Sequence, residues 1–140
     1  MKKRMSSILA GAVVALWAGA AIAGPNMADG KWEITSKMEM EGMPMAMPPV
    51  KTTMCLTAKE AVPQKAPKNQ DCKMISNKIE GNTVTWVMQC KDKHGTVDSK
   101  GRITYKGTSF DGKVVMNMTN EKGSRTMKQD MSGHRIGDCK

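Results

Sequence analysis

The sequence predicts an all-β protein: an antiparallel meander of about seven strands, curved into a half-open barrel, with one short helix and two disulfides. Three observations predict this fold class. Polar and apolar residues alternate in several runs, turn signals separate these runs about every 12 to 16 residues, and the four cysteines form an even set. Alternation at every second residue is typical of strands, because successive side chains leave a strand on opposite faces.

The N-terminal segment 1–23 has the pattern of a secretory signal peptide. Residues 2–4 are Lys-Lys-Arg, residues 8–20 are uncharged and mostly apolar, and residues 21–23 read Ala-Ile-Ala. A basic start, an apolar stretch and a small-x-small cleavage site define such a peptide. The apolar stretch is shorter than the roughly 20 residues that a membrane-spanning helix needs. We therefore expect cleavage after Ala23, a periplasmic protein with no membrane span, and a single β domain over 24–140.

Charge does not indicate a partner. The chain has a formal net charge of +9, which falls to +6 when the three basic residues of the signal peptide are removed. The remaining basic residues are scattered along the sequence, whereas a nucleic-acid groove requires a cluster of them. We expect no nucleic-acid partner.

The clearest strand is predicted over 31–40. Lysine, threonine and glutamate take the odd positions there, and the even positions carry Trp32, Ile34, Ser36, Met38 and Met40. A helix would distribute those charges around its circumference, so only a strand with one wet face explains the pattern.

The same alternation predicts the later strands. Their inward positions are Val84, Trp86, Met88 and Cys90, then Gly101, Ile103 and Tyr105, then Val114, Met116 and Met118, and a weaker run of Met127, Gln129 and Met131. Turns are expected at 81–82, 93–95, 107 and 120–123. The proline-rich segment 42–49 must be a loop, since proline cannot donate to a strand ladder, and it leads into a second strand over 50–55.

One short helix is expected after the second strand. Thr57 and Glu60 have the spacing of a capping box, in which each satisfies a free amide of the other. Pro63 should end the helix after about one turn.

The four cysteines are Cys55, Cys72, Cys90 and Cys139, and in an exported chain they predict two disulfides. No C-x-x-C pair is present, which argues against zinc. If a hairpin turns about Gly81, residues that face one another have numbers adding to 162, as 72 and 90 do. This favours Cys72–Cys90 and leaves Cys55–Cys139, although four cysteines allow three connectivities.

Methionine is the compositional outlier, with 15 residues in the chain. Five of them, Met38, Met40, Met88, Met116 and Met118, occupy inward strand positions. One interpretation is core filling, because methionine packs into irregular space. The other is that these five, with Trp32 and Trp86, line a site for a lipid or another apolar molecule on a curved sheet.

A second group of methionines lies in the proline-rich loop. Met43, Met45 and Met47 stand at every second position, with no histidine nearby in sequence. Soft thioether ligands select soft ions such as Cu(I) or Ag(I), so soft-metal binding is the alternative function. The same residues would also serve as a flap over the mouth of the sheet.

No catalytic constellation is present in the sequence. His94 and His134 have no carboxylate or hydroxyl partner placed by pattern, and no glycine-rich phosphate loop precedes a helix. We expect a non-enzymatic binding or envelope protein without a cofactor.

Short motifs in a particular order suggest a family. They are GKWEIT at 30–35, MPM at 43–45, CLT at 55–57, GNT at 81–83 before Trp86, and GHRIGDC at 133–139. In these the chain resembles the domain-of-unknown-function family numbered 3617, small exported bacterial proteins without an established activity. The resemblance implies a periplasmic, β-rich single domain, and it implies no catalytic or binding residue.

Overall fold

The computed structural model describes residues 24–43, 45, 47–62 and 71–140. The signal-peptide prediction for 1–23 and the helix stop at Pro63 concern residues outside this part of the chain. The elements in chain order are β1 (Gly30–Met40), β2 (Val50–Leu56), the 3-10 helix η1 (Ala58–Ala61), β3 (Asp71–Glu80), β4 (Thr83–Asp92), β5 (Gly95–Tyr105), β6 (Ser109–Asn120) and β7 (Gly123–Gly137).

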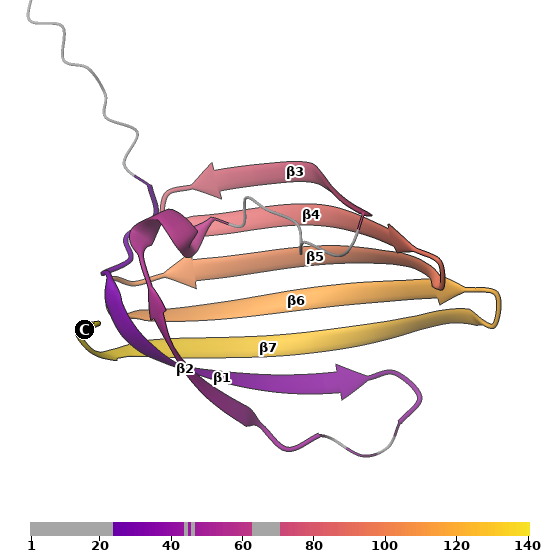
Figure 1. The fold of residues 1–140 in the computed structure, drawn as a ribbon, viewed down its shortest axis with the longest axis horizontal. Helices are drawn as coiled ribbons and strands as arrows, with labels where there is room; N and C mark the ends of the chain where they lie inside the picture. Colours follow the sequence, from indigo (N-terminus) through magenta and orange to yellow (C-terminus); the bar gives the residue numbers. More distant parts are fainter. Residues whose placement is uncertain (1–23, 44, 46, 63–70) are drawn as a thin grey trace, which may run out of the picture.

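The seven strands form one antiparallel sheet in the order β2-β1-β7-β6-β5-β4-β3 (Figure 1). Strands that follow one another in sequence are neighbours, except that β2 and β3 lie at opposite edges of the sheet. The first strand, β1, also pairs with the last, β7. This is the strand order of an up-and-down barrel that is open between β2 and β3. The expected half-open barrel of about seven strands is confirmed.

The two ends of the sheet differ (Figure 1). At one end lie η1 and the C-terminus, and we call this the helix end. At the other end lie the β4–β5 turn around Lys93 and His94 and the β6–β7 turn around Glu121 and Lys122, and we call this the hairpin end. The loop that joins β1 to β2 also projects toward the hairpin end.

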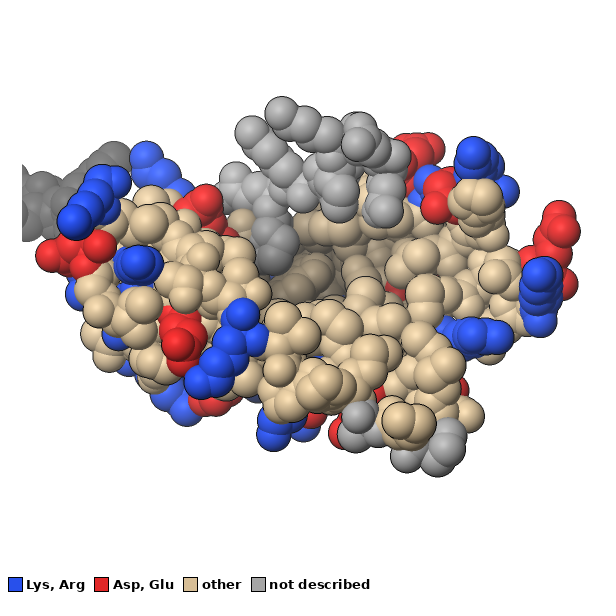
Figure 2. Space-filling model, turned by 60° about the horizontal axis from the view of Figure 1, so that its bottom comes forward, with Lys and Arg blue, Asp and Glu red and all other residues tan. Residues whose placement is uncertain are grey.

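Strand register assigns each side chain to one of two faces, because residues directly opposite one another share a face. Trp32 is fully buried, and its side of the sheet is the inner face. Figure 2 looks at the molecule from the side of β1 and β2: charged side chains gather toward its ends and margins, and uncharged residues surround the hollow in its middle.

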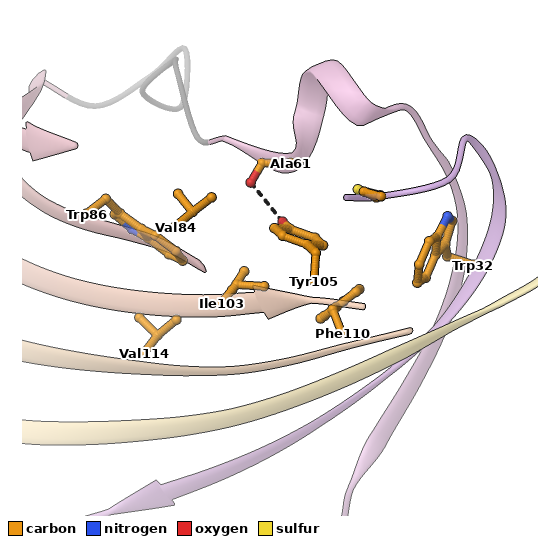
Figure 3. Packing of buried hydrophobic residues seen from close by; sticks show 9 residues of the cluster. Trp32, Ala61, Val84, Trp86, Ile103, Tyr105, Phe110 and Val114 are labelled. Atoms are coloured by element: carbon orange, nitrogen blue, oxygen red, sulfur yellow. Dashed lines mark hydrogen bonds between the residues drawn. The ribbon is translucent and has the colours of Figure 1, made fainter. Parts of the chain in front are cut away.

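The buried core lies on the inner face and gathers toward the helix end (Figure 3). Its members are Met27, Trp32, Ala61, Val84, Trp86, Ile103, Tyr105, Phe110 and Val114. Ring centroids of Trp32 and Phe110 are 5.6 Å apart, and those of Tyr105 and Phe110 are 5.7 Å apart, within the usual range of aromatic pairs. All four aromatic residues of segment 24–140 are therefore in one cluster.

The segment around η1 covers this core. Ala61 is 1% exposed, and its carbonyl accepts a hydrogen bond of 2.8 Å from the Tyr105 hydroxyl (Figure 3). The capping interaction is present: the Thr57 amide donates to the Glu60 carboxylate at 2.7 Å. The segment η1 is a single 3-10 turn, which agrees with the short helix expected from the sequence.

Both predicted disulfides are present, Cys72–Cys90 and Cys55–Cys139. The simple hairpin register behind the first pairing was only half right. Cys72 faces Cys90, but nearer the turn Glu80 faces Thr83, a register shifted by one residue. The turn uses both Gly81 and Asn82, and an irregularity between Met74 and Ser76 restores the register. A bulge of this kind places one extra residue, Ile75, in β3 and so aligns the two cysteines.

Candidate ligand-binding face

A row of methionines crosses the inner face toward the hairpin end. Successive register pairs link Met40 to Met127, Met127 to Met116, Met116 to Ser99, Ser99 to Met88, and Met88 to Met74. We call a line of residues that face one another across successive strands a rung. One rung across six strands thus carries five methionines and one serine. We call Met40, Met127, Met116, Met88 and Met74 the methionine row. With neighbouring strands about 4.8 Å apart, the rung spans roughly 24 Å.

The cover over the inner face is unequal. At the helix end Met27 and Ala61 are buried against the aromatic cluster, whereas every member of the methionine row is only half-buried. Met74, Met88 and Met116, on β3, β4 and β6, pack against the buried core. Met40 and Met127 are outside that set, and among the described residues nothing buries them fully.

The core-filling interpretation is therefore wrong for part of the predicted set. Met88 and Met116 pack against the core, but Met38, Met40 and Met118 do not. All five are half-buried, while Trp32 and Trp86 are core residues. The physical reason is that alternation identifies the face on which a side chain lies but not whether another element covers that face. The structure places all seven residues predicted to line an apolar site on the same face.

The rung next to the row, on its hairpin side, changes character. It contains the Cys72–Cys90 disulfide, Val97, Met118 and Arg125. Beside it a pocket of about 290 Å³ opens, lined by Met40, Met118, Asn120, Lys122, Gly123, Ser124 and Arg125. The methionine surface therefore ends in a pocket where thioethers meet two cationic side chains.

The two cations of this pocket have no ion pair with another described residue. Among the described residues no carboxylate lies within 4.0 Å of the charged groups of Arg125 or Lys122. Arg135, the arginine on the same face at the helix end, differs: its Nε donates to the Asp29 carbonyl at 2.7 Å and it pairs with Asp138.

Loop methionines Met43, Met45 and Met47 are separate from this row. Their exposed fractions are 56%, 82% and 41%, so they form no part of the core. Pro44 and Ala46 between them lie outside the described residues. Three thioethers are thus available to solvent on one short segment.

The remaining candidates are not brought together. His94 lies exposed in the β4–β5 turn, and His134 lies exposed on β7, 3.9 Å from the Glu33 carboxylate. In the described part of the chain, no three histidine, cysteine, aspartate or glutamate side chains cluster as metal ligands would.

A second pocket of about 500 Å³, lined mainly by polar and charged residues, lies on the outer face across β1, β7, β6 and β5. Both of its carboxylates are already paired: Asp130 with Lys113 at 3.4 Å, and Asp111 with Lys106 at 2.6 Å. Lys37 and Arg102 remain there as solvated cations.

Sequence reasoning missed Arg125, Lys122 and Met74 as residues of this face. Arg125 lies two residues before Met127 in the alternating run of β7, so extending the period by one step would have found it. Met74 is harder to find, because it requires the bulge in β3.

Fold and site together define a class: a small, disulfide-linked, open antiparallel sheet with a hydrophobic inner face that the described residues cover only in part. None of the helical segments in the described residues is long and apolar enough to cross a membrane. The chain belongs to the family described as protein of unknown function, DUF3617, whose model matches residues 27–139. No curated protein and no solved structure matches the sequence.

Proposed function

We propose that this protein is a non-enzymatic binding protein that holds an apolar small molecule or lipid on the methionine row. One observation carries the proposal: five thioethers on one rung, interrupted by Ser99, remain half-buried beside a core that is buried. A contiguous apolar surface that solvent still reaches is a recognised mark of a binding site. Methionine suits such a site because its unbranched, polarisable side chain adapts to ligands of different shape.

Open geometry supports the same conclusion. The sheet is curved and β2 does not pair with β3, and Figure 2 shows a hollow between the described residues on this side of the molecule. A ligand would enter there. The described residues offer no paired acid and base near the row, which also supports a non-enzymatic role.

The experiment compares two double variants, each of which replaces two methionines by glutamines. Met40→Gln/Met127→Gln places polar amides in the row, while Met43→Gln/Met45→Gln makes the same change in the exposed loop. Binding is measured by the fluorescence of N-phenyl-1-naphthylamine and its displacement by 1-decanol. Burying an apolar side chain contributes about 1.5–3 kcal/mol, so we expect at least tenfold weaker binding in the row variant and a change below about twofold in the loop variant. Equal affinity of the row variant and the wild type would refute the proposal.

A second function is supported by the loop. We propose that Met43, Met45 and Met47 bind a soft ion such as Cu(I) or Ag(I), because their thioethers are exposed and soft sulfur selects soft metals. Native mass spectrometry with Ag(I) should show an adduct that persists in Met40→Gln/Met127→Gln. Substituting leucine at all three loop positions should abolish it, and an adduct that survives this substitution contradicts the metal site.

We further propose that the protein is exported to the periplasm and cleaved after Ala23. The basic, apolar and small-x-small sequence of 1–23 supports export. Two disulfides support an oxidising compartment. N-terminal sequencing of protein from a periplasmic extract should begin at Gly24, and a mature chain that retains residues 1–23 would refute cleavage.

A further inference from the structure

We infer that the ligand is an anionic amphiphile: its acyl chain lies on the methionine row, and its carboxylate or phosphate group is held by Arg125 and Lys122. This inference rests on the proposed apolar-ligand function and specifies the chemical class of the ligand. The observation behind it is the pocket in which Met40 and Met118 share a lining with these two cations.

The position of Arg125 on the inner face is the first argument. It faces Met118 across the β6–β7 ladder and lies two residues before Met127 on the same face of β7, so a cation lies at the hairpin end of this face of the strand. On β6 and β7 the inner-face positions hold no aspartate or glutamate, and the nearest rung mates of Arg125 are Met118 and Val97. A charged side chain there has no structural partner on its own face.

The second argument is where these two cations lie. Other cations without an acidic partner among the described residues, such as Lys37 and Arg102, lie on the outer face, and the inner-face cation at the helix end, Arg135, is paired with Asp138. Arg125 and Lys122 have no acidic partner among the described residues, and both line the pocket that continues the methionine surface. Asn120 also lines this pocket, and its Oδ1 accepts a hydrogen bond from the Lys122 amide at 2.9 Å. A guanidinium group and an ammonium group are suited to carboxylate and phosphate oxygens.

Chemistry at both ends of the site then defines the ligand. Thioethers require an apolar chain, and unpaired cations at the end of that surface require a negative group attached to it. A neutral hydrocarbon would leave the cations unused, and a free inorganic anion would leave the methionine row unused.

The test uses three probes with the same twelve-carbon chain: dodecanoate, 1-dodecanol and dodecyltrimethylammonium, each below its micelle concentration. Competition with N-phenyl-1-naphthylamine at low salt gives their affinities. An exposed charge pair contributes a factor of a few, so two pairs should favour dodecanoate over dodecyltrimethylammonium by about tenfold. Dodecyl phosphate should behave like dodecanoate, whereas inorganic phosphate should not compete at the same concentration.

Two variants with the same change of charge provide the control. Lys122→Gln/Arg125→Gln should abolish the preference for dodecanoate but leave 1-dodecanol affinity within about twofold. Lys37→Gln/Arg102→Gln removes one lysine and one arginine from the outer face and should retain the preference. Arg125→Lys should retain most of it, because the charge remains.

The outcomes separate this inference from the function on which it rests. If all three probes bind with equal affinity, or if Lys122→Gln/Arg125→Gln keeps the preference, the anionic class is wrong while the apolar site stands. A preference for the ammonium probe overturns the inference in the same way. If none of the three binds, both the apolar site and its anionic ligand class are overturned.

Discussion

Trp86 lies directly opposite Gly101 across the β4–β5 ladder, and its indole ring occupies the space where a side chain at position 101 would begin. A Cβ built on Gly101 would be 2.0 Å from the ring. Phe110 and Gly133, paired across β6 and β7, repeat the arrangement at 2.2 Å. Two large rings thus lie on glycine backbone, which lets a small domain bury them on a strongly curved sheet.

Gly101→Ala should therefore destabilise the protein although alanine suits a strand better than glycine. The new methyl group must displace the Trp86 ring, and overpacking of this kind costs about 1–3 kcal/mol. Urea unfolding followed by tryptophan fluorescence measures the loss. Gly137→Ala is the matched control, since nothing lies within 4 Å of its Cβ position and its φ is not positive. A Gly101→Ala protein as stable as Gly137→Ala would contradict this account of the core.

The burial of Tyr105 leads us to expect that the folded state loses stability at high pH. Burial raises its pKa from the ordinary 10.0 to about 12. The folded state therefore holds the phenol proton more tightly than the unfolded state, so this contribution is complete below pH 10 and is lost as the pH rises toward 12, by about 2–3 kcal/mol at full ionisation. Tyr105 is the only tyrosine in the sequence, so absorbance at 295 nm reports it directly.

The native titration should have a midpoint near pH 12, and the titration in urea near pH 10. Tyr105→Phe removes the hydrogen bond to the Ala61 carbonyl and should cost about 1 kcal/mol at neutral pH. Because this variant has no phenol to ionise, its free energy of unfolding should fall less between pH 10 and 12 than that of the wild type. A native midpoint near 10 would show that the hydroxyl is exposed.

The sequence predicted those features of the fold that depend on residues within one strand or one hairpin. Alternation placed Trp32, Trp86 and Tyr105 on one face, and glycine and asparagine marked the turns, because both signals are carried within single strands and hairpins. The disulfide pairing followed for the same reason, although its hairpin register needed the bulge at Ile75.

What the sequence did not predict depends on how separate hairpins meet. The pairing of Phe110 with Gly133, and the alignment of Met40 with Met74 in one rung, require the register of several ladders at once. The covering of one half of the inner face depends on where the segment around η1 crosses it. Alternation therefore predicted on which face each methionine lies. Only the structure separated the methionines that pack against the core from the half-buried ones that do not.

The two disulfides should differ in their contribution to stability. Cys55–Cys139 closes 84 residues and ties the edge strand β2 to the chain after β7, whereas Cys72–Cys90 closes 18 residues within one hairpin. Loop-closure entropy then gives about 4.5 kcal/mol for the first and about 3 kcal/mol for the second. Urea unfolding of Cys55→Ala/Cys139→Ala and Cys72→Ala/Cys90→Ala compares them. A larger loss in the second variant would indicate that strain or residual structure outweighs chain entropy.

The methionines of the inner face should fall into two groups by stability. Met88→Ala and Met116→Ala remove side chains packed against the core and should each cost about 2 kcal/mol, whereas Met38→Ala and Met118→Ala should cost less than about 1 kcal/mol. Ligand binding should divide them differently. A ligand that binds only the folded state raises the melting temperature, so 1-decanol should stabilise Met88→Ala and Met116→Ala, which lie in the methionine row, by fewer degrees than Met38→Ala, which does not. If all four substitutions cost the same and leave the decanol effect unchanged, the inner face has a single uniform core, and the half of it near the hairpin end has no separate function.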